Sequence, residues 1–128
     1  MGLFGSGLSK DGKTARKDRY DEFLDSLCQL ELAPAQIVDL PVEQLARFVL
    51  LDLIRQEDAG IVVGNWAIGV KRRYQGDPEV LLALGEALAW LNIQMYLVDD
   101  LAHANEYPWR RVSRAGAAWL NTPPAPAD

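Results

Sequence analysis

The chain of 128 residues has little of what many catalytic and metal-binding proteins depend on, because it contains one histidine and one cysteine. A single cysteine cannot form a disulfide within the chain, which is typical of a protein from a reducing compartment such as the cytoplasm. That residue, Cys28, lies in an apolar stretch between Leu24 and Leu30 with no histidine or basic residue close in sequence. We therefore expect a buried structural thiol rather than a nucleophile.

The sequence also lacks the longer motifs that identify many enzymes and membrane proteins. It has no apolar run of about 18 residues, the length that a membrane-spanning helix needs. The glycines between Gly2 and Gly7 follow no strand and lack the spacing of a phosphate-binding loop, and no serine lies in a nucleophile elbow. These absences predict a protein that is not an enzyme and has no resident cofactor.

The two ends of the sequence differ in composition from the middle. The N-terminal sequence MGLFGS matches the minimal pattern for lipidation at Gly2, and a basic stretch follows it. The composition of residues 1–16 nevertheless favours a flexible, soluble tail, and residues 122–128 form a proline-rich tail. Between them we expect a single domain over residues 17–121.

Charge is segregated along the chain, whose formal net charge is −5. A net acidic chain binds nucleic acid poorly, because phosphate binding depends on the number of lysines and arginines. The block Lys71–Arg73 and the arginines from Arg110 to Arg114 could serve nucleic acid only if the fold made them neighbours. We expect these basic residues to pair instead with acidic segments of the same fold.

Apolar residues recur at helical spacing through the predicted domain. This pattern predicts an all-α fold, a compact bundle of about four to five helices. Asp18 is a suitable N-cap for a helix over 18–32, which Pro34 ends. Pro41 occupies the favoured position at the start of a helix over 42–58. This second helix is apolar on more than one face, so we expect it to be buried on several sides.

Residues 61–70 fit two different structures. The run IVVGNWAI, with Gly64 and Asn65 at its centre, is typical of a short β-hairpin. In a helix, Trp66 and Val70 would share one apolar face. We favour the helix because an isolated hairpin is marginally stable and no third strand is evident. Gly60 and Gly64 would then allow a neighbouring backbone to pack closely.

The clearest helix start is at Asp77, which can cap a helix that has Pro78 at its first position. The apolar residues that follow repeat as a heptad, so we predict a long central helix over about residues 78–105. Its apolar seam is a candidate homodimer contact and consists of Leu81, Leu84, Leu88, Leu91, Met95, Val98 and Ala102. We predict a last helix from Pro108 to Leu120.

The predicted central helix would bring together the only candidate metal ligands. Asp99, His103 and Glu106 would share one helix face, and two carboxylates of the predicted helix over 42–58, Asp52 and Glu57, could complete a site in the bundle core. We favour the simpler interpretation, in which Asp99 and His103 form a solvated pair at a polar helix end.

A candidate protein-binding patch lies at the start of the predicted last helix, at Trp109, Arg110, Arg111 and Arg114. Tryptophan and arginine are enriched among the residues that dominate binding energy at interfaces. The alternative is that Trp109 and Trp119 only dock this helix on the bundle.

Together these features favour a small interaction protein, such as an adaptor, an assembly chaperone or an inhibitor or immunity-type protein, that binds a protein partner through helical faces. The first alternative is a metal-binding helical protein with Asp99, His103 and Glu106 as ligands. The second is a nucleic-acid-associated regulator that uses the basic blocks.

Overall fold

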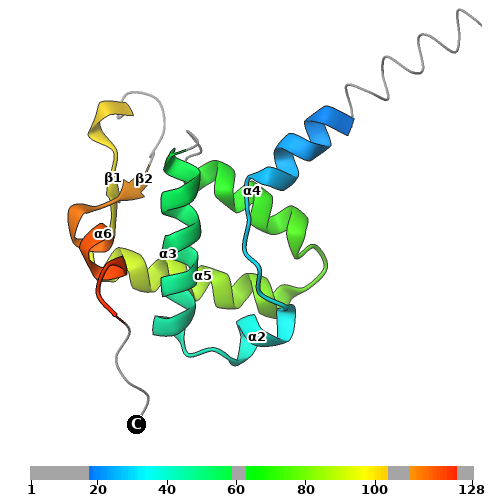
Figure 1. Cartoon of the computed structure of the whole chain (residues 1–128). Coiled ribbons are helices and arrows are strands. Elements are labelled where there is room, and N and C mark those ends of the chain that lie inside the picture. Colours follow the sequence, from blue (N-terminus) through cyan, green and yellow to red (C-terminus); the bar gives the residue numbers. More distant parts are fainter. Residues whose placement is uncertain (1–17, 59–62, 104–109, 124–128) are drawn as a thin grey trace, which may run out of the picture.

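The computed structural model describes residues 18–58, 63–103 and 110–123 (Figure 1). Residues 18–26 are helical. The other elements are α2 (Pro34–Asp39), α3 (Val42–Asp58), α4 (Val63–Arg73), α5 (Pro78–Ile93), β1 (Leu97–Asp99), the short 3-10 helix η1 (Leu101–His103), β2 (Arg110–Val112) and α6 (Arg114–Leu120). The prediction of a mainly helical fold is confirmed, and a small antiparallel sheet accompanies the helices.

The core forms where α3 crosses α5, the two helices that pack most extensively (Figure 1). Leu45, Val49 and Leu53 follow one another at four-residue spacing along α3, and all three are buried. They meet buried residues of α5, among them Leu84 and Leu91. Burying a leucine stabilises a fold by about 1.5–3 kcal/mol, so this crossing supplies much of the stability. The predicted helix over 42–58 is confirmed.

The helix at the ambiguous run IVVGNWAI is α4, so the hairpin over residues 61–70 is wrong for the described part, which begins at Val63. Trp66 and Val70 are buried on its inner face, as the helical interpretation predicted. Placing the indole ring and the valine in the core offsets the weak helix propensity of the glycines in this segment.

Close backbone packing against α4 occurs at Gly69 and not at Gly64. A Cβ atom on Gly69 would lie 2.6 Å from the backbone nitrogen of Cys28 and 2.7 Å from the carbonyl carbon of Leu27. A Cβ atom on Gly64 would meet nothing within 4 Å, and Gly60 lies outside the described residues. The absence of a side chain at Gly69 therefore lets the chain at residues 27 and 28 lie directly on α4.

The first helix is shorter than predicted. Residues 18–26 are helical, but the chain is extended from Cys28 to Ala33, and Pro34 begins α2 rather than ending a helix. Leu27 and Cys28 are buried against α4. The backbone of this stretch forms hydrogen bonds with other parts of the chain, for example from the Tyr74 hydroxyl to the Leu32 carbonyl at 3.0 Å. Tertiary contacts therefore replace the helical bonds that local spacing favoured.

The start of α5 follows the prediction, but its end does not. The Asp77 side chain accepts a hydrogen bond from the Val80 amide at 3.2 Å, and Pro78 is the first helical residue. The helix ends at Ile93, so the long central helix over 78–105 is wrong, and so is the heptad seam proposed for a homodimer.

A left-handed cap terminates α5. Met95 has φ 62°, the Tyr96 amide donates to the Leu91 carbonyl at 2.9 Å, and the Met95 amide donates to the Asn92 carbonyl at 3.0 Å. These are the bonds of a Schellman motif, in which the left-handed position is usually glycine. Because methionine occupies that position, no glycine marks the end of this helix in the sequence.

After this cap the chain forms β1, which pairs antiparallel with β2 in the register Leu97 to Val112, Val98 to Arg111 and Asp99 to Arg110. The predicted last helix is therefore wrong at residues 110–112, while Pro108 lies outside the described residues. The helix begins instead at α6, capped by the Ser113 hydroxyl, which accepts from the Gly116 amide at 3.0 Å.

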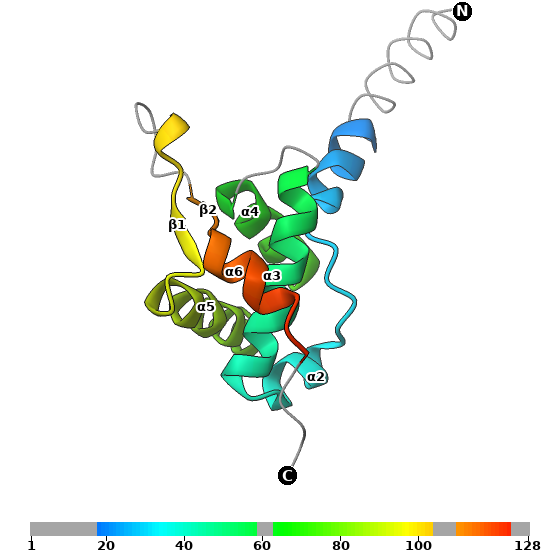
Figure 2. The same cartoon turned by 60° about the vertical axis from the view of Figure 1, so that its left-hand side comes forward.

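The sheet and α6 lie together beside α3 (Figure 2). Trp119 of α6 stacks on Tyr96 with ring centroids 4.9 Å apart and contacts Trp90 at 5.5 Å, and the Arg47 guanidinium of α3 lies 5.0 Å from the Trp119 ring. Arg47 also donates to the carbonyls of Leu120 and Thr122. Trp119 thus docks the last helix on the bundle, as one of the two interpretations held.

No helix within the described ranges is both long and apolar enough to cross a membrane.

Candidate protein-binding surface

The predicted metal ligands do not share a helix. Asp99 is the last residue of β1, His103 ends η1, and Glu106 lies outside the described residues. The Asp99 carboxylate forms an ion pair with Arg110, whose Nη1 lies 3.3 Å away. No cluster of three or more metal-binding side chains occurs among the described residues. The prediction that Asp99 and His103 share a helix face, on which the metal hypothesis depended, is therefore wrong.

Asp52, offered as a further ligand, is buried at the centre of the fold with donors already bound to it. One carboxylate oxygen accepts from the Trp66 indole at 2.6 Å and from the Gln29 amide at 3.1 Å. The other accepts from the Gln56 side chain at 3.5 Å. These bonds join α3 and α4 to the extended segment and satisfy a buried charge, which is the role of a structural carboxylate.

Cys28 lies beside this carboxylate and is fully buried, as predicted. The pKa of the thiol is raised to about 11, chiefly by burial and in smaller part by the neighbouring Asp52, while the Leu30 backbone and Arg73 lower it. Because the thiolate is the reactive form, a thiol with so high a pKa is a poor nucleophile at neutral pH. The structure supports the expected structural role of Cys28.

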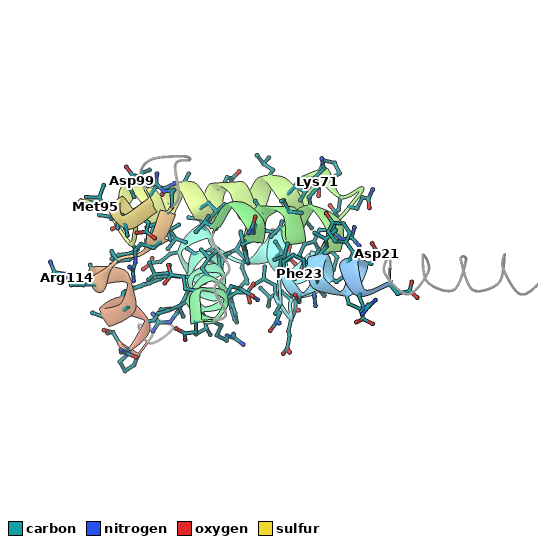
Figure 3. All side chains as sticks on the ribbon, turned by 90° about the horizontal axis from the view of Figure 1, so that it is seen from above. Asp21, Phe23, Lys71, Met95, Asp99 and Arg114 are labelled. Atoms are coloured by element: carbon teal, nitrogen blue, oxygen red, sulfur yellow. The ribbon has the colours of Figure 1, made fainter. Side chains whose placement is uncertain are left out.

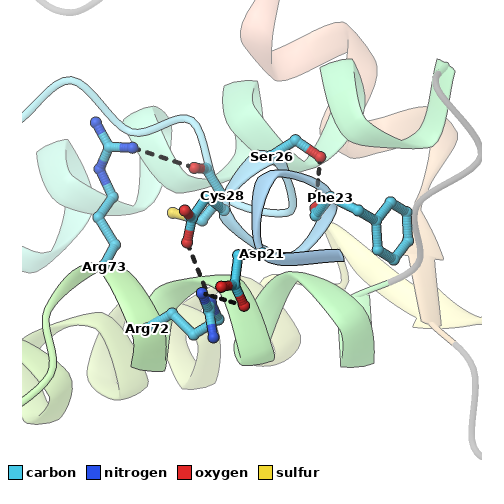
Figure 4. A network of polar contacts seen from close by, with 7 residues as sticks. Asp21, Phe23, Ser26, Cys28, Arg72 and Arg73 are labelled. Carbon is cyan, nitrogen blue, oxygen red and sulfur yellow. Dashed lines mark hydrogen bonds and ion pairs between the residues drawn. The ribbon is translucent and has the colours of Figure 1, made fainter. Parts of the chain in front are cut away.

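Two basic side chains of the block Lys71–Arg73 bind the first helix and the segment that follows it (Figure 4). This agrees with the expectation that the block pairs within the fold. Arg72 lies 3.6 Å from Asp21 and 3.1 Å from Asp25, and Arg73 donates to the Cys28 carbonyl at 3.3 Å. Figure 3 shows Lys71 and Arg114 on opposite sides of the molecule. The two basic blocks are therefore not neighbours, which the nucleic-acid hypothesis required.

Glu57 fixes the sheet to α3. Its carboxylate accepts a hydrogen bond from the backbone amide of Val112 in β2, at 2.6 Å. The pKa of Glu57 is raised overall, because the effect of burial exceeds the opposing effects of the Val112 amide and the nearby Arg111 charge. The carboxylate thus anchors the strand that carries the predicted arginines, and β1 lies on the outer side of β2 (Figures 1 and 2).

The predicted patch divides into one paired and two exposed arginines, while Trp109 lies outside the described residues. Arg110 bonds Asp99 and the Leu97 carbonyl, and its Nε is the one buried side-chain polar atom without a partner in the described part of the chain. Arg111 and Arg114 are exposed and take part in no ion pair between described residues. Arg111 lies near enough to Glu57 to lower its pKa, and both exposed guanidinium groups can still reach carboxylates of a partner.

Large apolar side chains lie on the segments that enter and leave the sheet. Ile93 is 76% exposed, Met95 68% and Leu101 80%. The Ser113 hydroxyl donates to the Met95 carbonyl at 2.8 Å, which places Met95 beside the start of α6. We use the name arginine surface for these three residues together with Arg111 and Arg114, all of which belong to the segments from the end of α5 to the start of α6. Figure 3 shows Met95 and Arg114 at the same end of the molecule.

Sequence reasoning found the arginines of this surface but missed its apolar members. Met95 fell on a heptad position of the predicted central helix, and Leu101 widened the same apolar stripe, so both were assigned to a helix seam. The local signal available was the run Leu97-Val98, a short β-type pair that could have interrupted the helix.

Comparison of the chain with protein-family models, with curated proteins and with solved structures finds no match.

Proposed function

We propose that this protein is a small interaction protein that binds a protein partner through the arginine surface. The observation that carries the proposal is the exposed, left-handed Met95, which is flanked in sequence by two other exposed apolar residues, Ile93 and Leu101. A left-handed conformation at a residue other than glycine costs about 1–2 kcal/mol, and such strain tends to be kept at binding sites.

The composition of this surface supports the proposal and indicates the chemistry of the partner. Exposed Ile93, Met95 and Leu101 supply apolar area, and methionine adapts well to the shape of a partner. Arg111 and Arg114 supply charges that recognise carboxylates. The partner would thus present apolar side chains next to acidic ones. The buried Asp52 and Cys28 and the partly buried Glu57 make contacts within the fold, so they do not compete with this surface as candidates.

Quantitative affinity capture from the native host tests the proposal. The double variant Met95→Ser with Leu101→Ser is compared with the wild type and with Leu82→Ser, which alters a leucine of α5 that is 65% exposed. We expect the double variant to lose a partner that both other proteins retain. Equal recovery with all three proteins, or no partner with the wild type, would contradict the proposed function.

A further inference from the structure

A hollow of about 350 Å³ lies between α2 and α3, and no residue of the arginine surface lines it. Its lining is mainly apolar and consists of Leu32, Ala35, Gln36, Asp39, Leu40 and Phe48. The aromatic ring among these residues, Phe48, is 43% exposed. The side-chain oxygen of Gln36 accepts from the Ala33 amide at 2.9 Å, and no described residue accepts from its NH2 group. The hollow therefore offers an aromatic ring, aliphatic side chains and a hydrogen-bond donor.

An exposed apolar strip on α3 joins this hollow to the place where the chain leaves α6. The Arg47 guanidinium binds the carbonyls of Leu120 and Thr122. Leu51 lies four residues after Arg47 and three after Phe48, so the three side chains are successive neighbours on the helix surface. Leu51 is 40% exposed. Figures 1 and 2 both show the chain leaving α6 at the end of the molecule where α2 and the start of α3 lie.

The sequence that follows Thr122 has the composition and the length to reach the hollow. It reads PPAPAD, so Pro123–Ala127 carries three prolines and no charged side chain. Such a sequence favours the polyproline II conformation, in which five residues span roughly 15 Å at about 3.1 Å per residue. The two steps from Arg47 through Leu51 to Phe48 are about 5–6 Å each. The segment is therefore long enough to cross from Arg47 to the hollow.

We infer that the hollow between α2 and α3 binds residues 124–127 of the same chain. Proline-rich segments dock in grooves that contain aromatic rings, because the polyproline II conformation exists before binding and costs little entropy. This conformation leaves the backbone carbonyls without internal hydrogen bonds, so one of them can accept from the Gln36 amide. The lining has one charged residue, Asp39, and residues 124–127 bring no carboxylate against it.

The tether at Arg47 favours this segment over the same segment of a second copy. Because Thr122 is already bound to α3, the following residues are held close to the hollow. A short flexible connection gives an effective concentration on the order of millimolar. A contact too weak to join two molecules in dilute solution is therefore occupied within one molecule. The docked segment would extend the hold of α6 on α3 to α2.

Fluorine NMR of the full chain, labelled with 4-fluorophenylalanine, tests the inference. The sequence contains three phenylalanines, and the variant Phe48→Leu identifies the resonance of Phe48. The difference in chemical shift between H2O and D2O reports how far each ring is exposed to solvent. Pro124→Ser with Pro126→Ser removes two rings of the segment, and Asp128→Asn is the control that keeps every proline.

The ring of Phe23 is the internal reference, because it is 53% exposed against 43% for Phe48 and does not line the hollow. In the wild type the solvent-dependent shift of Phe48 should be clearly smaller than that of Phe23, since the segment covers the Phe48 ring. In the double proline variant it should rise toward the Phe23 value, and in Asp128→Asn it should stay as in the wild type. The Phe23 shift should be the same in all three proteins.

A Phe48 shift that is equal in the wild type and the double proline variant overturns the inference. So does protection of Phe48 that disappears on dilution, since the occupant would then be the segment of a second copy. A change at Phe23 as large as the change at Phe48 also overturns it, because the proline substitutions would then act on the fold as a whole.

Discussion

Asp52 at the centre of α3 and Arg110 at the edge of the sheet both have polar atoms shielded from solvent. The Asp52 carboxylate accepts from Trp66, Gln29 and Gln56, so both of its oxygens are used. Arg110 is bound through its terminal nitrogens, but its Nε has no partner. At the centre, the polar groups are hydrogen-bonded, as a stable core requires. At the sheet end, one buried polar atom has no partner and large apolar side chains are exposed to solvent.

Two helix ends show the same difference. The turn after α4 places Gly76 at φ 84°, and the turn after α5 places Met95 at φ 62°. Glycine adopts this conformation without steric strain, whereas methionine does not. The turn after α4 therefore has the favourable residue, and the turn after α5 has an unfavourable one with a large exposed side chain.

The largest expected effect on stability is at Gly69, where the extended segment lies on α4. Gly69→Ala should destabilise the fold by about 3 kcal/mol, because the new Cβ would meet backbone atoms that cannot move freely. Gly64→Ala is the matched control in the same helix and should stabilise by up to about 1 kcal/mol. Urea unfolding measures both. Equal effects from the two variants would contradict the close approach at Gly69.

The next effect compares carboxylates of the two regions. Asp52→Ala leaves the Trp66 indole and the Gln29 amide without their acceptor and should cost about 2 kcal/mol. Asp99→Ala removes an exposed pairing with Arg110 and should cost at most about 1 kcal/mol. Thermal unfolding at neutral pH checks the order. A larger loss from Asp99→Ala would reverse the roles assigned to the centre and the sheet.

A smaller effect of opposite sign is expected at the two left-handed turns. Met95→Gly relieves the strain and should stabilise the fold by about 0.5–1 kcal/mol, since part of the relief is lost to the greater freedom of unfolded glycine. Gly76→Ala introduces the same strain and should destabilise by about 1 kcal/mol. Denaturation midpoints of the two variants should therefore move in opposite directions. Destabilisation by Met95→Gly would mean that the methionine side chain supports the fold.

At neutral pH the smallest effect is at Cys28, whose contribution changes only at alkaline pH. The pKa of this thiol in the folded protein is raised from 9.0 to about 11, so folding favours the protonated form. The stability that this gives is fully present below pH 9.0 and is lost as the pH rises to about 11. A thiol reagent at pH 8 should label the unfolded protein and leave the native protein unlabelled. Rapid native labelling would place the thiol outside the core.

The parts of the fold that local chemistry determines could be predicted from the sequence. The start of α5 was evident because Asp77 and Pro78 are sufficient to define it, and α3 was evident from its apolar pattern. The end of α5 was not, because Met95 takes the position where glycine would mark the cap. β2 was missed because three residues carry little pattern and its partner β1 lies more than ten residues earlier in the chain.

The candidate site could be predicted only in part for the same reason. Arg110, Arg111 and Arg114 were chosen from their residue types, and the structure shows that the first of them is paired while the other two are exposed. Met95 and Leu101 became candidates only once the helix was known to end at Ile93. The contact at Gly69 depends on a chain segment about 40 residues away, which no local pattern reveals.

Site-specific photo-crosslinking in the native host tests the central claim most directly. A photoreactive phenylalanine analogue replaces Leu101 of the arginine surface in one protein and Leu82 of α5 in another, since both leucines are largely exposed. We predict a discrete crosslinked product from position 101, absent from position 82 and lost when Arg111→Glu and Arg114→Glu are added. Equal crosslinking at both positions, or a product that survives the charge reversal, would contradict a partner-binding role for this surface.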